Sequence, residues 1–289
     1  MSGNYVWILA ILASVLFGFL LAWAGSDGSM QIYGLPLFSV SVVFAFLIQW
    51  ICFVPSFLFQ TEKYFDLTGS LTYVSIIIFA LVMSDDLGVR KLTIGIFVLL
   101  WALRLGTFLF SRIRSAGEDS RFKVIKTNFF QFLMTWTLQG LWVCVTCGAA
   151  LAAITSDKQN SLGVFFFVGS AFWLVGFFVE VLADHQKSEF NRELENSGKF
   201  IHTGLWAWSR HPNYFGEIML WSGLAVVALP VLEGWQYVTL ISPIFVFLLL
   251  TKISGINLLE RQAELRWGGD PDYQSYKRST NALIIWPFR

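Results

Sequence analysis

Charged residues are scarce in this chain. Asp, Glu, Lys and Arg make up only 13% of its 289 residues, whereas a soluble globular domain carries about 25%. With a hydrophobic fraction of 56% and a mean hydropathy of +0.62, the chain has too little polar surface to cover a soluble body. The formal net charge of +1 lacks the basic excess that nucleic-acid binding needs. The composition therefore predicts an integral membrane protein with no nucleic-acid partner.

Cysteine is also rare, with three residues in the whole chain. Cys144 and Cys147 have the C-x-x-C spacing, but they lie inside an apolar run. Zinc would need two further ligands at the same depth, and the sequence offers none nearby. We therefore expect the pair to be small helix-packing residues, with neither a metal site nor a disulfide framework.

The common nucleotide-binding and hydrolytic motifs are missing. The sequence contains no G-x-G-x-x-G after a strand, no Walker loop, no H-E-x-x-H and no G-x-S-x-G. Any nucleotide would consequently be held by helices and loops at the membrane, because no Rossmann domain is present to bind it.

Long apolar runs dominate what is present. A bilayer core of about 30 Å needs about 20 apolar residues in a helix. The expected spans are 5–24, 35–59, 68–84, 90–111, 128–155, 161–180, 213–231 and 236–252. The sequence thus predicts an all-α, polytopic transmembrane bundle of about eight spans, with seven as the alternative. We divide it into an N-terminal transmembrane helix and loop, 1–34, and a main membrane domain, 35–289.

Basic residues are unevenly distributed between the two sides of this arrangement. Sixteen of the twenty Lys and Arg residues fall in 60–67, 112–127, 181–212 and the tail from 252. The opposite loops hold only Arg90, Lys91 and Lys158, and Arg104 lies within a span. The positive-inside rule then places both termini and the long loops in the cytosol, and seven spans would break this agreement. The membrane would be a bacterial inner membrane or the endoplasmic reticulum.

The richest polar stretch precedes and begins the seventh span. Pro212 suits the first position of a helix, which would place Asn213 and Glu217 on one face. Arg210 and His211 come just before that start, where free N–H groups favour an anion. This pattern predicts a phosphate or nucleotide site. The alternative is an Arg210–Glu217 ion pair with His211 anchored at the interface.

Further polar candidates lie near the ends of other spans. Glu180 and Asp184 stack at i, i+4 and could accept ribose hydroxyls, or they could simply form a solvated helix end. A charge at membrane depth usually has a partner or a function, and Asp66 is a candidate partner for Arg104. A basic cluster that could hold nucleotide phosphates or lipid head groups consists of Arg112, Arg114 and Arg121.

The run Gly204–Glu217 resembles the signature of the steroid 5-alpha-reductase superfamily. Residues 35–289 as a whole are similar to the superfamily's bacterial-type branch of membrane reductases. Further matching segments are Trp101–Gly106, Ser111-Arg112, Asp119–Phe122, Asp184–Lys187 and Tyr273–Tyr276 with Thr280 and Pro287. The central signature also occurs in isoprenylcysteine and phospholipid methyltransferases.

This resemblance implies NADPH in a cavity open to the cytosol, and hydride transfer to a conjugated double bond of a lipid, steroid-like or isoprenoid substrate. Asn213, Glu217 and Asp184 match cofactor-contacting positions of the family. Looser correspondences are Glu180, Arg112, Arg114 and Tyr276. The set of cofactor candidates is completed by Arg210, His211, Tyr214 and Arg121.

The acid that polarises the substrate carbonyl is a point of departure from the steroid-reducing members. Those members use a Glu and a Tyr near the second and fourth helices, but Trp101 stands here where the Tyr is expected. The catalytic candidates are Glu62, Tyr64 and Asp66. Two other functions remain open: an S-adenosylmethionine-dependent methyltransferase of lipid or prenylated substrates, and a non-catalytic lipid-binding membrane protein.

Overall fold

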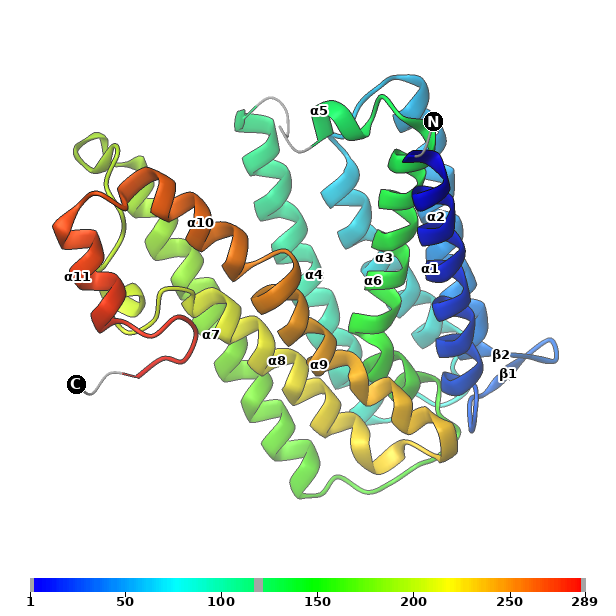
Figure 1. Ribbon diagram of the computed structural model, residues 1–289. Coiled ribbons are helices and arrows are strands. Elements are labelled where there is room, and N and C mark those ends of the chain that lie inside the picture. Colours follow the sequence, from blue (N-terminus) through cyan, green and yellow to red (C-terminus); the bar gives the residue numbers. More distant parts are fainter. Residues whose placement is uncertain (1–2, 117–121, 287–289) are drawn as a thin grey trace. The chain divides into compact units, whose positions relative to one another are not determined.

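Helices account for nearly all of the regular structure in the computed structural model, which describes residues 3–116 and 122–286 (Figure 1). Within those residues, eight helical segments are long and apolar enough to cross a membrane. They are Gly3–Gly25, Leu37–Leu58, Phe65–Val82, Val89–Leu109, Phe129–Thr155, Val164–Arg192, Pro212–Val231 and Gly234–Trp267. The predicted all-α bundle of eight spans is confirmed.

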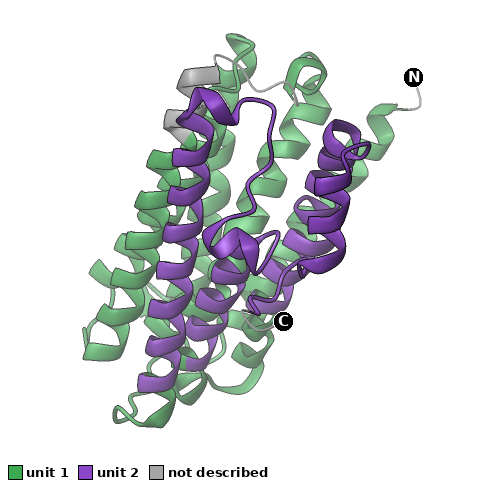
Figure 2. Cartoon of the chain, turned by 90° about the vertical axis from the view of Figure 1, so that its left-hand side faces the viewer, with its two compact units in different colours: residues 1–166, 227–242 green, residues 167–226, 243–289 purple. Residues whose placement is uncertain are grey.

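The chain forms two compact units, coloured separately in Figure 2. The first unit comprises residues 1–166 and 227–242, and the second comprises 167–226 and 243–289. The three catalytic candidates belong to the first unit. The candidate cofactor residues from Glu180 onward belong to the second.

The first unit opens with a helix and a short hairpin. Strands β1 (Gln31–Ile32) and β2 (Leu35–Pro36) pair antiparallel across a turn in which Tyr33 and Gly34 both have positive φ. Two positive φ values are what a two-residue hairpin turn of type I′ requires. The helices of this unit are α1 (Gly3–Gly25), α2 (Leu37–Leu58), α3 (Phe65–Val82), α4 (Val89–Ala116), α5 (Phe122–Ile125) and α6 (Phe129–Thr155).

Helix α6 is the centre of the first unit and packs against α1, α2 and α3. Its residues are continuously buried from Val143 to Thr155, a stretch rich in Ala, Gly and Cys. Small side chains let neighbouring helix backbones approach closely in a membrane, where packing drives helix association. Cys144 and Cys147 lie in this stretch as buried free thiols, which agrees with the expected packing role.

The second unit is built on a close crossing of α7 (Val164–Arg192) and α8 (Pro212–Ala228). A Cβ atom placed on Gly216 would lie 2.5 Å from the carbonyl oxygen of Gly176, and one on Gly223 would lie 2.6 Å from that of Gly169. The glycines are therefore required at both contacts. The unit continues with α9 (Ile241–Leu248), a π-helical turn (Leu249–Ile253), α10 (Ile256–Trp267) and α11 (Pro271–Ser279).

Candidate functional site

The segment between α7 and α8 folds back onto the end of α7. Trp206 is only 3% exposed, and its indole Nε1 donates a hydrogen bond of 3.0 Å to the carbonyl oxygen of Ala183. One turn further along α7, the side chain of Gln186 accepts a hydrogen bond of 3.0 Å from the amide of Leu205. A buried Trp needs a partner for its N–H, so these contacts fix the path of the chain into α8.

Helix α8 begins at Pro212, as predicted, and its first turn lies against α7. Asn213 Nδ2 donates to Asp184 Oδ1 at 3.2 Å. One turn along each helix, Gly216 contacts the backbone of Glu180, whose side chain is buried. The structure therefore brings together three of the cofactor candidates, Asp184, Asn213 and Glu180, around the crossing of the two helices.

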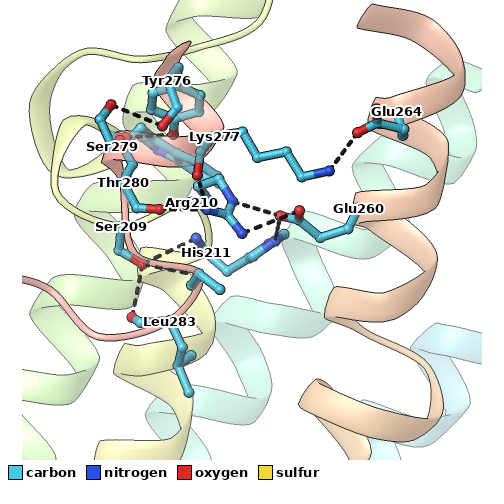
Figure 3. Close-up of polar contacts among 12 residues, drawn as sticks. Ser209, Arg210, His211, Glu260, Glu264, Tyr276, Lys277, Ser279, Thr280 and Leu283 are labelled. Carbon is cyan, nitrogen blue, oxygen red and sulfur yellow. Dashed lines mark hydrogen bonds and ion pairs between the residues drawn. The ribbon is translucent and has the colours of Figure 1, made fainter. Parts of the chain in front are cut away.

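Arg210 is held by α10 and α11 (Figure 3). Its Nε donates to Glu260 Oε1 at 2.9 Å and its Nη2 to Glu260 Oε2 at 3.3 Å, which is a two-pronged ion pair. Its Nη1 donates to the carbonyl oxygens of Lys277 and Thr280. Planar guanidinium suits such fixed, multiple bonding. All three of its nitrogens are thus used to join three segments of this unit, and the partner is Glu260 instead of the Glu217 considered as an alternative.

His211 completes the same cluster. Its Nε2 lies 3.0 Å from Glu260 Oε1, and its ring stacks on Tyr214 with centroids 5.6 Å apart and planes 13° apart. Burial lowers the pKa of His211, although the hydrogen bond with Glu260 opposes that shift. A low pKa favours the neutral imidazole at pH 7, which can donate from one ring nitrogen to the Glu260 carboxylate.

Helices α10 and α11 contact each other and the segment that leads to α8. Asp270 caps α11 by accepting from the amide of Asp272 at 2.9 Å, with Pro271 in the first position of the helix. Tyr276 donates from its hydroxyl to the carbonyl oxygen of Trp206 at 2.6 Å. An ion pair between Lys277 and Glu264 further joins the two helices. Tyr276, a cofactor candidate, therefore contacts the segment leading to α8.

Two cavities adjoin around these helices, with volumes of about 530 Å³ and about 540 Å³. Both are lined by Gly198, Lys199, Phe200 and Tyr276. Two of these shared lining residues are aromatic: the ring of Phe200 stacks on that of Tyr276, with centroids 5.4 Å apart. The cavity of about 530 Å³ is also lined by Lys187, Asn191, Arg210, His211, Glu260 and Arg266. Cations, amides and aromatic rings around such a volume suit a phosphorylated ligand with flat ring systems.

Two features of this site were missed from the sequence. Glu260 stands in a helix with mixed charges and was not among the candidate residues, yet it contacts both Arg210 and His211. The two apolar residues that precede it, Leu258 and Leu259, are the local signal of a partly buried position. Phe200 is the second omission, because nothing local indicates that it faces rings of α11 some 70 residues away.

The catalytic candidates lie in the first unit, at and before the start of α3. Glu62 is 5% exposed, and its Oε2 accepts a hydrogen bond of 2.7 Å from Lys126 Nζ in an ion pair. Tyr64 precedes the helix, and its carbonyl oxygen accepts from both the amide and the hydroxyl of Thr68. Asp66 lies in the first turn. The three residues are thus brought to one helix start, next to a buried cluster of aromatic rings formed by Phe53, Phe122, Phe132 and Trp136.

Three of the cofactor candidates fall in or near the segment that is not described. Arg121 lies outside the described residues. Arg112 and Arg114 belong to the last turns of α4, for which only the helical backbone is described. Their contribution to a phosphate site stays a prediction.

Comparison with known proteins places the chain in a family. A family model described as "Protein of unknown function (DUF1295)" matches residues 52–280, which is most of the chain. The matched region covers the catalytic candidates, the α7–α8 crossing and the Arg210–Glu260 cluster. The chain belongs to this family, and with it to the steroid 5-alpha-reductase-like superfamily.

Curated relatives match a shorter segment. A protein of Bos taurus named "3-oxo-5-alpha-steroid 4-dehydrogenase 1" is 32% identical over 72 residues, which is 25% of this chain and 28% of the relative. The protein of the same name from Mus musculus is 33% identical over 63 residues, or 22% of this chain and 25% of the relative. The chain thus aligns with about a quarter of the length of these relatives. No solved structure matches significantly.

Proposed function

We propose that this protein is a membrane-embedded, NADPH-dependent reductase that reduces a conjugated double bond of a lipidic substrate. The observation that carries the proposal is the Asp184–Asn213 contact at the start of α8, in the same unit as two cavities lined by cations and aromatic rings. The similarity to proteins named as steroid dehydrogenases supports an oxidoreductase.

The residues around the cavities fit a dinucleotide. Lys187, Lys199 and Arg266 supply positive charge for phosphate groups. Asp184 and Asn213 do not line these cavities, but they lie close in the chain to residues that do, Lys187 and His211, and in this proposal they supply acceptors and donors for ribose hydroxyls or a carboxamide. In this proposal Arg210 acts mainly by holding α10 and α11 in place, because its donors already bond Glu260 and two carbonyl oxygens.

NADPH, when bound, supplies a hydride to the β-carbon of an enone. The protein must then polarise the carbonyl oxygen, and a proton adds to the α-carbon, so that the products are the saturated ketone and NADP⁺. Glu62, Tyr64 and Asp66 are the groups proposed for this role. Tyr64 carries a hydroxyl donor, and the ion pair with Lys126 keeps Glu62 oriented.

Cofactor binding is tested with the purified full-length chain. NADPH should quench tryptophan fluorescence with saturation, while S-adenosylmethionine should not bind. Asn213→Ala and Glu217→Ala should weaken NADPH binding by roughly tenfold or more, since each removes a polar contact worth about 1.5 kcal/mol or more to a charged ligand. Asn257→Ala is the matched control, because Asn257 is exposed and, within the described part of the chain, its side chain hydrogen-bonds a backbone carbonyl alone.

The competing functions give different results. Binding of S-adenosylmethionine without NADPH would establish the methyltransferase alternative. Binding of neither, with unchanged membrane lipids after deletion of the gene, would favour a non-catalytic lipid-binding protein. If Asn213→Ala loses stability but binds NADPH normally, the residue is structural and the site lies elsewhere.

The reaction is tested without knowing the substrate. The protein is incubated with a total membrane lipid extract and deuterium-labelled NADPH, and the lipids are analysed by mass spectrometry. The reduced lipid should contain two more hydrogen atoms than its precursor, and one of the two should be deuterium. Tyr64→Phe should abolish the label while leaving NADPH binding intact, if Tyr64 polarises the carbonyl.

A further inference from the structure

A small cavity of about 190 Å³ opens in the first unit at the start of α4. It is smaller than the cavities of about 300–1,000 Å³ that hold drug-sized ligands, so it suits a single polar group. Its lining comes from the turn before α4, the first turn of α4, the end of α6 and the loop that follows α6. The residues are Asp86, Gly88, Val89, Arg90, Lys91, Ala153, Lys158, Gln159, Asn160, Ser161, Leu162 and Val231.

The three cations of the loops predicted to be non-cytosolic all line this one cavity. Lys and Arg are depleted on that side of a membrane protein, and here the remaining Arg90, Lys91 and Lys158 are gathered in one place. Only one acidic residue lines the cavity, Asp86, and it already accepts a hydrogen bond from Gln159. Among the lining residues three cations therefore face one carboxylate, while Lys158 also forms an ion pair with Glu233, which does not line the cavity.

Arg90 is only 6% exposed, and one N–H group of its guanidinium is not used in a hydrogen bond to the described residues. Its Nη1 and Nη2 donate to the carbonyl oxygens of Asn160 and Ser161, each at 2.9 Å. Its Nε is buried and has no hydrogen-bond partner among the described residues. Leaving a buried charged donor unsatisfied is costly, so an acceptor in the cavity would stabilise it.

Lys91 is 7% exposed, and its Nζ hydrogen-bonds only the sulfur of Met30, at 3.8 Å, among the described residues. Asp85, Asp86 and Asp157 lie within electrostatic range of its amino group. Thioether sulfur is a weak acceptor, so an ammonium group here retains most of its capacity to donate. The first turn of a helix such as α4 presents backbone N–H groups that have no acceptor within the helix, together with a partial positive charge.

We propose that this cavity binds a phosphate group, supplied either by a phospholipid head group or by free phosphate. Val89 and Leu162 line the cavity and also belong to the exposed apolar surface of the unit. A phospholipid could therefore place its phosphate on the cations and its acyl chains along these side chains. None of the residues assigned to the proposed reduction lines this cavity, and the proposal does not depend on that reaction.

Lipid binding is measured by native mass spectrometry of the full-length chain in detergent. Phosphatidylglycerol is the probe, and diacylglycerol, which lacks the phosphate, is the control ligand. One phosphatidylglycerol should be retained by the wild-type protein, and Lys91→Gln should weaken its binding by roughly tenfold or more. Lys63→Gln is the matched control, because Lys63 is exposed and does not line the cavity.

Free phosphate is tested by the thermal unfolding midpoint in phosphate and in chloride at equal ionic strength. A phosphate-dependent rise that Lys91→Gln removes, without phosphatidylglycerol retention, would assign the same site to a soluble anion. Lys158→Gln keeps the test decisive if Lys91→Gln fails to fold, because Lys158 is more exposed; it should weaken binding about two- to fivefold. Equal binding by wild type, both cavity variants and Lys63→Gln would overturn the proposal.

Discussion

Replacing Glu260 by Gln tests the cluster that fastens α10 and α11 to the start of α8. The substitution keeps the shape of the side chain but removes its charge, and it affects the contacts with Arg210 Nε, Arg210 Nη2 and His211 Nε2. Breaking a fully buried ion pair costs about 3–5 kcal/mol. The side chains here are 15% and 19% exposed, and Gln can still accept one bond. We therefore expect a loss of about 2 kcal/mol.

This loss should appear as faster local opening. Amide hydrogen exchange of peptides from α10 and α11 reports the free energy of such opening. A loss of about 2 kcal/mol corresponds to exchange roughly 30-fold faster. Peptides from α6, in the other unit, should exchange at the wild-type rate in the same sample.

Glu264→Gln provides the matched control for this measurement. Glu264 lies one turn further along α10 and also forms an ion pair, with Lys277, but both side chains are far more exposed. Exposed pairs contribute little to stability, so exchange should be nearly unchanged. If the two variants exchange alike, or if neither differs from wild type, burial of the Arg210–Glu260 pair does not stabilise this region.

Three further predictions follow from other contacts. Gly216→Ala should lower the thermal midpoint by destabilising the α7–α8 crossing by about 1–3 kcal/mol, because the new Cβ would meet a backbone oxygen of Gly176. Gly269→Ala is the control: the space around Gly269 is open, so its thermal midpoint should be unchanged. Burial lowers the pKa of His211, so as pH falls below about 6.5 the unfolded chain takes up a proton at this residue before the folded chain does. Acidification therefore favours unfolding, and the thermal midpoint should drop more in the wild type than in His211→Gln. A membrane-impermeant maleimide should label Gln159→Cys only from the non-cytosolic side and Lys199→Cys only from the cytosolic side; the reverse pattern would refute the predicted orientation.

The sequence alone determined the class of architecture, because the signals for it are local. Each apolar run is long enough to span a bilayer and must satisfy its own backbone hydrogen bonds, so it forms a helix regardless of its neighbours. The starts of α8 at Pro212 and of α11 after Asp270 were predictable for the same reason, since cap and first-turn preferences act within a few residues. The signature around Arg210 also located the polar region of the second unit.

Tertiary structure alone decided which side chains meet. Arg210 pairs with Glu260, 50 positions away, and not with nearby Glu217, since the fold of α10 brings a partly buried carboxylate to the guanidinium. Glu62 meets Lys126 and Arg90 meets the carbonyl oxygens of Asn160 and Ser161 over similar separations. Hydropathy and capping carry no information about such long-range pairs, because side-chain partners depend on how whole helices are oriented and packed. Charged residues are scarce in this chain, and each of these pairs stabilises a charge that would be costly to place in an apolar protein without a partner.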